Sequence, residues 1–203
     1  MVIRRVFIDD RALRHWFGVL HGLARVTVKA SLLPPDRMSE DRPFRMALGE
    51  LLQAALSDAA PAPVYLRQWP VASWPPPLRH AAIELVGKSL ADILPFAHLW
   101  IGTRGVYTPT HSDDEDNLLI QIHGRKRVLI WPPSTRDGKG PPIGAEQDYP
   151  HLSVCLGAGD LLYLPKDWAH EVTALDGAVS LNFWHPLVGK KIGRFPLIGR
   201  TTP

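Results

Sequence analysis

The sequence predicts a mainly β protein, with an antiparallel barrel or sandwich in its second half and helices packed outside it. Two observations support this fold class. From about Phe96 onward, short segments rich in branched and aromatic residues are bounded by Gly, Pro or Asp: AHLWIG, NLLIQIH, KRVLIWPP, DLLYLP, HEVTAL and AVSLNFWHP. Before that point, apolar residues recur with a helical period and prolines separate the segments.

Three helices are expected in the first half. The third lies in SWPPPLRHAAIELVGKSL, whose prolines suit the first helical turn. Before it, PAPVYLRQWP is expected to be extended, because a residue that precedes proline disfavours helix. The first two helices each have one apolar face, made by Leu13, Trp16, Phe17, Leu20 and Leu23 and by Phe44, Leu48, Leu51, Leu52 and Leu56.

A length of 203 residues suits a single domain over residues 1–203. Within it, we expect a mostly helical flank (1–95), a barrel core (96–186) and a basic tail (187–203). The proline-rich segment PPSTRDGKGPPIGAEQDYP is expected to be a long loop between strands, a place where lids and substrate loops often occur.

Composition narrows the class of protein. Hydrophobic residues make up 45% of the chain and charged residues 21%, as in globular proteins. The net charge is only +3, and no block of basic residues forms the stripe that nucleic-acid binding needs. No signal peptide or membrane-spanning stretch is recognisable, so we expect a cytoplasmic protein. The single cysteine, Cys155, excludes an intramolecular disulfide and a thiol-rich zinc site, and its apolar context LSVCLGAG predicts a buried side chain.

Potential metal ligands precede one predicted strand. His111 and Asp113 lie two residues apart in TPTHSDDEDNLLIQIH, so in an extended segment their side chains point to the same face. A distant histidine, His170, follows the strand in GDLLYLPKDWAHEV. Two histidines and one carboxylate form the facial set that holds ferrous iron and leaves other positions open. Two unrelated barrel histidines are the structural alternative.

A lysine is predicted on the same face. We expect Gly124-Arg125 to be a two-residue hairpin loop that pairs His123 with Lys126 and Gln121 with Val128. The face of the metal ligands would then carry Asn117, Leu119, Gln121, Lys126, Val128 and Ile130. A lysine inside a narrow barrel is costly unless an anion meets it. Either Lys126 grips the far carboxylate of a dicarboxylate cosubstrate, or it lies at the barrel mouth and reaches water.

The last predicted strand, AVSLNFWHP, adds polar and aromatic side chains to the interior. Ser180, Asn182 and Trp184 share one face, as do His170 and Val172. A buried asparagine needs a hydrogen-bonding partner, which a cosubstrate or a metal ligand can supply. Trp184 can wall a pocket, act as a core aromatic, or do both.

These motifs resemble those of the JmjC/cupin-8 family of Fe(II)- and 2-oxoglutarate-dependent oxygenases. The resemblance covers Thr108 to Trp184 and rests on T-P-x-H-x-D, an Asn six residues beyond the His, Q-I-x-G-x-K-R, a strand ending in P-P, G-D-x-x-x-x-P-x-x-W-x-H and N-F-W. Within the family, the likeness is greatest to the asparaginyl hydroxylase that acts on hypoxia-inducible factor. A weaker likeness begins at Tyr65 in VYLRQ.

The resemblance implies a double-stranded β-helix, the jelly-roll or cupin-like barrel, with flanking N-terminal helices. It implies that His111, Asp113 and His170 bind iron, that Lys126, Thr108 and Tyr65 bind the far carboxylate of 2-oxoglutarate, and that Asn117, Asn182 and Trp184 line the pocket. The implied cofactors are Fe(II), 2-oxoglutarate and O2. Asp at the carboxylate position, where many lysine demethylases of the family carry Glu, favours hydroxylation over demethylation.

The substrate is less well defined. A peptide, a protein side chain or an amino-acid-like molecule is expected, with a demethylase or RNA-base hydroxylase as the alternative. A non-catalytic cupin-like binding protein and a metal-dependent isomerase or hydrolase are rival classes. The acidic cluster Asp113–Asp116 either attracts a basic substrate or is a solvated strand entrance. The chain ends soon after the barrel, without the C-terminal helices through which the asparaginyl hydroxylase dimerises, so a homodimer is one open possibility.

Overall fold

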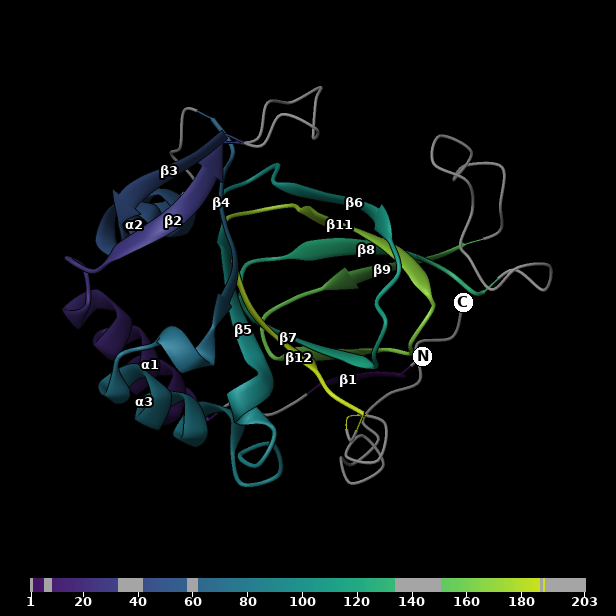
Figure 1. Ribbon diagram of the computed structural model, residues 1–203, viewed down its shortest axis with the longest axis horizontal. Coiled ribbons are helices and arrows are strands. Elements are labelled where there is room, and N and C mark those ends of the chain that lie inside the picture. Colours follow the sequence, from purple (N-terminus) through teal and green to yellow (C-terminus); the bar gives the residue numbers. More distant parts are fainter. Residues whose placement is uncertain are drawn as a thin grey trace.

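Two antiparallel sheets face each other in a computed structural model that describes residues 2–5, 9–32, 42–57, 62–133, 151–186 and 188 (Figure 1). The larger sheet has eight strands in the order β1-β10-β7-β12-β5-β4-β2-β3, and the smaller has four in the order β6-β11-β8-β9. Helices cover the outer side of the larger sheet, and its other side faces the smaller sheet. The predicted mainly β jelly roll with flanking helices is confirmed.

Most strands of the barrel come from the second half of the chain, and β1 joins them from the N-terminus by pairing with β10. The larger sheet contains β1 (Val2–Arg5), β2 (Thr27–Leu32), β3 (Arg42–Ala47), β4 (Val64–Pro70), β5 (Ala97–Gly102), β7 (Asn117–His123), β10 (Asp160–Leu164) and β12 (Ala178–Trp184). The smaller sheet contains β6 (Tyr107–His111), β8 (Lys126–Trp131), β9 (Leu152–Leu156) and β11 (Ala169–Ala174). The helices are α1 (Asp10–Gly22), α2 (Leu48–Ser57) and α3 (Pro76–Val86), with 3-10 turns η1 (Val71–Ser73) and η2 (Leu94–Phe96).

The two faces of strand β7 pack against different hydrophobic cores. Its side chains alternate, so Leu118, Ile120 and Ile122 pack against the helices, whereas Leu119 packs inside the barrel. The helix-side core also contains Trp16 and Leu20 of α1, both fully buried. The barrel core is smaller and consists of Leu119, Val128, Ile130, Val154, Leu156, Leu162 and Leu164. The space left beside this smaller core holds the polar side chains described below.

The three predicted helices form, with local signals that explain their starts. Asp9 caps α1, because its Oδ1 accepts hydrogen bonds from the backbone N–H groups of Arg11 and Ala12 at 2.8 and 2.9 Å. Helix α3 has prolines in its first turn. The prediction for the second helix was wrong at one residue. Phe44 lies in β3, and α2 begins only at Leu48, where the β2–β3 pairing ends.

Residues 1–95 hold more strand than the helical patterns indicated. Strands β2, β3 and β4 extend the larger sheet past β5, and β4 coincides with the segment expected to be extended. Cys155 is exposed, against the prediction, because β9 alternates and directs Val154 and Leu156 inward instead. The predicted loop over 134–150 and the predicted tail, apart from buried Val188, lie outside the described residues.

The predicted β7–β8 hairpin is wrong. β7 pairs with β10 and β12, and β8 pairs with β9 and β11, so Gly124-Arg125 carries the chain from one sheet to the other. His123 and Gln121 therefore pair with β12, not with β8. The predicted facing of Lys126, Val128 and Ile130 toward the interior nevertheless holds, because the alternation within each strand does not depend on its partner.

No helix among the described residues has the length and apolar character needed to cross a membrane.

The crossing between the two sheets generates a stability prediction. Gly124 has φ +70°, and a Cβ there would collide with the carbonyl oxygen of Gly177. Gly124→Ala should lower the free energy of unfolding by about 2 kcal/mol or more, measured by urea denaturation. Gly18 is the control, because it is exposed within α1 and a Cβ there meets nothing within 4 Å. Gly18→Ala should instead stabilise by about 0.5–1 kcal/mol. Equal effects of the two substitutions would contradict this account of the crossing.

Candidate metal centre and cosubstrate pocket

Strand pairing brings the two candidate histidines together. His111 ends β6 and His170 lies near the start of β11, and the two residues are direct partners in the antiparallel pair. Their rings are 4.3 Å apart between centroids. The register shifts between His170 and Val172, so the pairing is irregular just beyond the histidines. Asp113 follows two residues after His111, and the chain brings its carboxylate back to the histidine pair.

The ring nitrogens of both histidines have distinct environments. Nδ1 of His111 lies 2.7 Å from the carbonyl oxygen of Pro109, and Nδ1 of His170 lies 3.0 Å from that of Trp168. A carbonyl oxygen only accepts hydrogen bonds, so each Nδ1 carries the hydrogen and each Nε2 offers a lone pair. The two Nε2 atoms are each 3.7 Å from an oxygen of Asp113. This tautomer is the one that a metal requires of an Nε2 ligand.

Burial favours the neutral form of His170. Its pKa is lowered, chiefly by desolvation and then by the nearby His111, while the Asp113 carboxylate opposes both effects. A neutral imidazole is the form that binds metals. One ligand atom from each of His111, Asp113 and His170 lies within 4.8 Å of the others, so these three residues can hold one metal ion.

Hydrogen bonds from the opposite sheet fix the Asp113 carboxylate. Its Oδ2 accepts from Asn117 Nδ2 at 2.7 Å and from Trp184 Nε1 at 2.8 Å. The amide oxygen of Asn117 in turn accepts from Asn182 Nδ2 at 2.9 Å. Asn117 and Asn182 are buried, so each hydrogen bond satisfies a group that water does not reach. The hydrogen bonds from Asn117 and Trp184, with Asn182 supporting Asn117, therefore orient the carboxylate. They all reach Oδ2, so none of these three side chains donates a hydrogen bond to Oδ1.

Lys126 lies in the interior with a hydroxyl partner. It is 2% exposed, and its Nζ donates to Ser180 Oγ at 2.6 Å. In the part of the chain that the structure describes, no carboxylate lies against this ammonium group. Desolvation consequently lowers the pKa of Lys126 to about 7. A buried cation that lacks an anion is the environment expected of a site that takes up a carboxylate.

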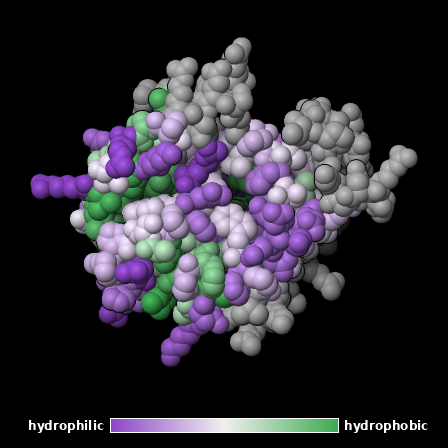
Figure 2. Space-filling model, in the orientation of Figure 1, coloured by the Kyte–Doolittle hydropathy of each residue, from purple (hydrophilic) through white to green (hydrophobic). Residues whose placement is uncertain are grey.

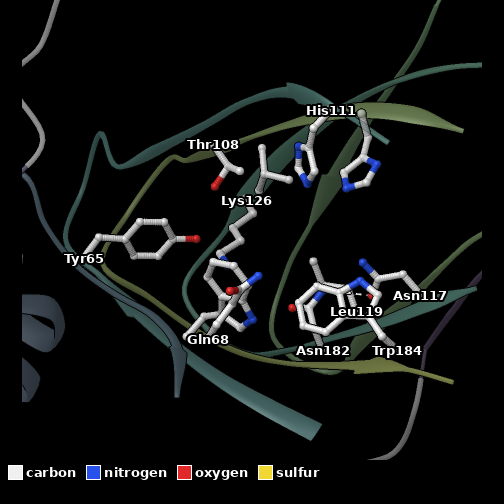
Figure 3. A pocket seen from close by; sticks show the side chains of 12 residues that line it. Tyr65, Gln68, Thr108, His111, Asn117, Leu119, Lys126, Asn182 and Trp184 are labelled. Atoms are coloured by element: carbon white, nitrogen blue, oxygen red, sulfur yellow. Dashed lines mark hydrogen bonds between the residues drawn. The ribbon is translucent and has the colours of Figure 1, made fainter. Parts of the chain in front are cut away.

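Tyr65 and Thr108 complete this end of the pocket. Tyr65 is buried, and desolvation raises its pKa to about 12 although a side-chain hydrogen bond with Thr108 opposes the shift. Its hydroxyl is therefore a neutral donor at physiological pH. Figure 3 shows Tyr65, Thr108 and Lys126 toward one end of the pocket and Asn117 and Trp184 toward the other. All the predicted site residues except Asp113 line the cavity itself, together with Gln68, Trp100, Leu119 and Val172.

Three residues that belong to the site in the structure, Ser180, Gln68 and Trp100, were not predicted from the sequence as site residues. Ser180 could have been found, because it shares a face with Asn182 on a predicted strand. Gln68 and Trp100 gave no such signal. Gln68 reaches the pocket because the β4–β5 pairing shifts register between Leu66 and Trp69, and sequence periodicity does not reveal a bulge of this kind.

Comparison with known proteins decides the family. The model of the JmjC domain matches residues 86–187, half of the chain. This chain belongs to the JmjC family. JmjC enzymes use Fe(II), 2-oxoglutarate and O2, and the cluster His111, Asp113 and His170 can bind the metal. The predicted membership of the JmjC/cupin oxygenases is confirmed, and so is the predicted set of cofactors.

The curated relatives of this JmjC chain are longer proteins. It is 32% identical to lysine-specific demethylase JMJ31 of Arabidopsis thaliana over 123 residues. The matched region covers 49% of this chain and 22% of that protein. HSPB1-associated protein 1 of Rattus norvegicus is 32% identical over 120 residues, 47% of this chain and 25% of its own length. The bifunctional peptidase and (3S)-lysyl hydroxylase JMJD7 of Homo sapiens is 25% identical over 146 residues, 52% of this chain and 45% of that protein. The chain thus spans less than half of each of these relatives.

The hydrogen bonds to Asp113 generate a prediction about metal affinity. Trp184→Phe removes the Nε1 donor but keeps an aromatic wall, so the Asp113 carboxylate becomes freer to rotate. We expect Mn(II) to bind about tenfold more weakly, measured by calorimetry or by the Mn(II) electron paramagnetic resonance signal. Trp69→Phe is a matched control, since Trp69 packs against Trp74 at the helix-side core. Unchanged Mn(II) affinity in Trp184→Phe would show that this hydrogen bond does not orient the carboxylate.

Proposed function

We propose that this chain is an Fe(II)- and 2-oxoglutarate-dependent oxygenase that hydroxylates a carbon of a peptide, a protein side chain or an amino-acid-like small molecule. One observation carries the proposal. A two-histidine, one-carboxylate cluster with available Nε2 atoms shares a pocket with a buried lysine that has no carboxylate partner among the described residues. A metal site alone, or a buried lysine alone, would fit many functions. Their combination fits a cosubstrate with a metal-chelating end and a far carboxylate.

His111, Asp113 and His170 would hold the iron. Their donor set is that of ferrous oxygenases, which leaves several coordination positions open. When bound, Fe(II) with 2-oxoglutarate and O2 supplies the oxidising power for the reaction. The contribution of the protein is to fix the ligand orientation. The backbone carbonyls of Pro109 and Trp168 set the histidine tautomers, and the side chains of β7 and β12 hold the carboxylate.

Lys126 would bind the far carboxylate of 2-oxoglutarate. The lysine donates to a single hydroxyl in the structure, so its ammonium has hydrogens left for a carboxylate. Tyr65 and Thr108 line the same end of the pocket and can add neutral hydrogen bonds. Charge-assisted hydrogen bonds are about twice as strong as neutral ones, so the lysine would dominate cosubstrate affinity.

Asn117, Asn182 and Trp184 would act next to the metal. Through its bond to Asp113, Asn117 has a positioning role, and Asn182 supports Asn117. Trp184 both donates to Asp113 and contacts Trp100 at 6.0 Å between ring centroids, which places an apolar wall beside the ligands. Such a wall limits water around the reacting groups.

Hydroxylation is favoured over demethylation by the identity of the carboxylate ligand, Asp113. The names of the relatives include both a lysine-specific demethylase and a lysyl hydroxylase, so either outcome occurs among proteins similar to this chain. A non-catalytic cupin-like protein is the second class of candidate. The pairing of a metal cluster with a buried lysine gives this binding-protein class no support. We also propose a cytoplasmic location.

Asp113→Ala should abolish substrate-coupled succinate formation and lower metal affinity, because the cluster loses its one carboxylate. Succinate can be measured by mass spectrometry. Asp114→Ala is the matched control, since Asp114 is an exposed acid next in the chain and is absent from the pocket lining. Full coupled turnover in Asp113→Ala would show that the metal is held elsewhere. If the wild-type protein shows no visible absorption band with Fe(II) and 2-oxoglutarate under anaerobic conditions, the binding-protein alternative gains the support.

The affinity for 2-oxoglutarate should depend on pH through Lys126. Its pKa of about 7 in the free protein should rise when a carboxylate pairs with it, so binding takes up a proton above pH 7. Affinity should therefore be level below about pH 7 and fall as the pH rises above it. Lys126→Met should weaken binding by about ten- to a hundredfold and remove this dependence. Titration calorimetry with Mn(II) in buffers of different ionisation enthalpy measures both effects.

Arg127→Ala is the matched control for Lys126→Met, because Arg127 is exposed on the outer side of the same strand. It should keep both the affinity and its pH dependence. An unchanged requirement for 2-oxoglutarate in Lys126→Met would remove the lysine from the cosubstrate site.

A further inference from the structure

A groove continues outward from the cosubstrate pocket over strands β2, β3 and β4. It has a volume of about 530 Å³ and shares Gln68, Trp100, Thr108 and His111 with the pocket. A second hollow of about 340 Å³ adjoins it and shares Lys29, Arg67 and Gln68 with it. The candidate metal ligand His111 therefore lies in one continuous depression with the surface of the extended sheet. In Figure 2, hydrophilic side chains surround the hollow on this face.

The floor of the groove carries cations that face each other. In β2, Val28 and Ala30 point into the helix-side core, so Lys29 and Ser31 point the other way, into the groove. Lys29 is the direct partner of Arg45 on β3. Both are exposed, and in the described part of the chain neither has a carboxylate partner. Like charges placed directly opposite in a sheet are destabilising unless an anion lies between them.

Strand β4 adds Arg67 and Gln68 at the junction of these cavities. Gln68 has φ +52°, a conformation that non-glycine residues rarely adopt, at the irregularity in the β4–β5 pairing. This irregularity directs Gln68 into the pocket and into both hollows of the groove. Strained backbone at such a position is typical of functional sites. Arg67 is half-buried and lines the same two hollows as Lys29.

The charged side chains that line the groove, among the described residues, are all of one sign. Among the described residues that line its two hollows, Lys29, Arg45 and Arg67 are cations, and none is an aspartate or glutamate. The acidic cluster after His111 does not contribute. Asp116 accepts a hydrogen bond from the backbone N–H of Lys166, and neither Asp114 nor Glu115 lines the groove. The groove thus selects against a basic substrate segment by repulsion and favours an acidic one.

The position of β3 favours an extended peptide as the occupant. β3 is the last strand of the larger sheet in the described part of the chain, so its outer edge can pair with an extended segment. Three cations over two adjacent hollows are fewer than nucleic-acid backbones usually meet along a basic face. Ser31, the strand partner of Tyr65, lies two residues from Lys29, a separation of about 7 Å along β2.

We propose that the groove formed by Lys29, Arg45, Arg67 and Gln68 binds an acidic segment of a polypeptide substrate and presents a neighbouring residue to the metal centre. This inference rests on the proposed oxygenase function and specifies its substrate class. The acidic side chains lie within a few residues of the oxidised residue, because the cations begin about two strand positions from the cosubstrate end of the pocket. Arg45 and Lys29 hold one carboxylate between them, and Gln68 contacts the chain where it enters the pocket.

The test compares fluorescein-labelled peptides of equal length with alternating Glu-Ala, Gln-Ala and Lys-Ala sequences. Fluorescence anisotropy measures their binding to the wild-type protein with Mn(II) and 2-oxoglutarate under anaerobic conditions. The Glu-Ala peptide should bind most tightly, and added salt should weaken its binding. Lys29→Glu should weaken it by about tenfold, because the substitution removes one cation and places a carboxylate opposite Arg45. That new cross-strand pair also supports the fold of the variant.

Lys88→Glu is the matched control. Lys88 is an exposed lysine just after α3, outside the residues that line the groove, and its substitution makes the same change of charge. It should leave peptide affinity within about twofold. Arg45→Gln provides a second variant that neutralises the pair without adding a carboxylate, and it should also weaken binding of the Glu-Ala peptide.

Three results would overturn the inference. They are tighter binding of the Lys-Ala or Gln-Ala peptide, equal weakening by Lys29→Glu and Lys88→Glu, and tighter binding of a labelled single-stranded oligodeoxynucleotide than of the Glu-Ala peptide. The last result would assign the groove to nucleic acid. Each applies when the wild-type protein shows the anaerobic absorption band with Fe(II) and 2-oxoglutarate. Absence of that band in the wild-type protein contradicts the proposed function instead, so the two failures are distinguishable.

Discussion

The antiparallel pairing of β6 with β11 is the constraint on which the site depends. It places His111 opposite His170 although 59 positions separate them along the chain, and backbone carbonyls next to each histidine turn both Nε2 atoms toward the same point. The two imidazoles and the Asp113 carboxylate therefore lie close enough to share one metal ion. The pairing places two polar rings at the barrel mouth. Burial lowers the pKa of one of them, His170, and so favours the neutral form that a metal requires.

The third ligand links the two sheets. Asp113 follows a strand of the smaller sheet, but the side chains that hold its carboxylate, Asn117 and Trp184, belong to β7 and β12 of the larger one. Lys126 and Ser180 form a second link of the same kind, since β8 and β12 lie in different sheets. The polar interior therefore fixes how the sheets face each other. A shift of one sheet would separate the metal ligands from their support and the ammonium from its hydroxyl partner at the same time.

The interior and the rim carry different patterns of charge. Among the described residues, the Asp113 carboxylate lies with the histidines at one end of the pocket and the Lys126 ammonium lies toward the other, which suits a cosubstrate that chelates a metal at one end and carries an anion at the other. Outside it, the extended part of the larger sheet carries Lys29, Arg45 and Arg67, while the acids after His111 do not line the groove. Strands β2, β3 and β4, which lie beyond β5 in the sheet, thus form a cationic surface next to the candidate metal site.

The sequence by itself determined the three helices and six of the strands, β5, β7, β8, β10, β11 and β12, because alternation and helical period are properties of local chain geometry. It did not identify β1, β6 or β9 as strands, and it placed Cys155 of β9 on the wrong face. It also singled out His111, Asp113, His170 and Lys126 as residues of unusual polarity for their context. Only the tertiary structure decided which strands pair. Gly124-Arg125 looks like a hairpin loop, yet it crosses between sheets, because pairing depends on burial of whole faces, not on the loop alone. Likewise, the bulge that turns Gln68 into the pocket and the meeting of Lys29 with Arg45 arise from strand partners distant in sequence, which no local pattern records.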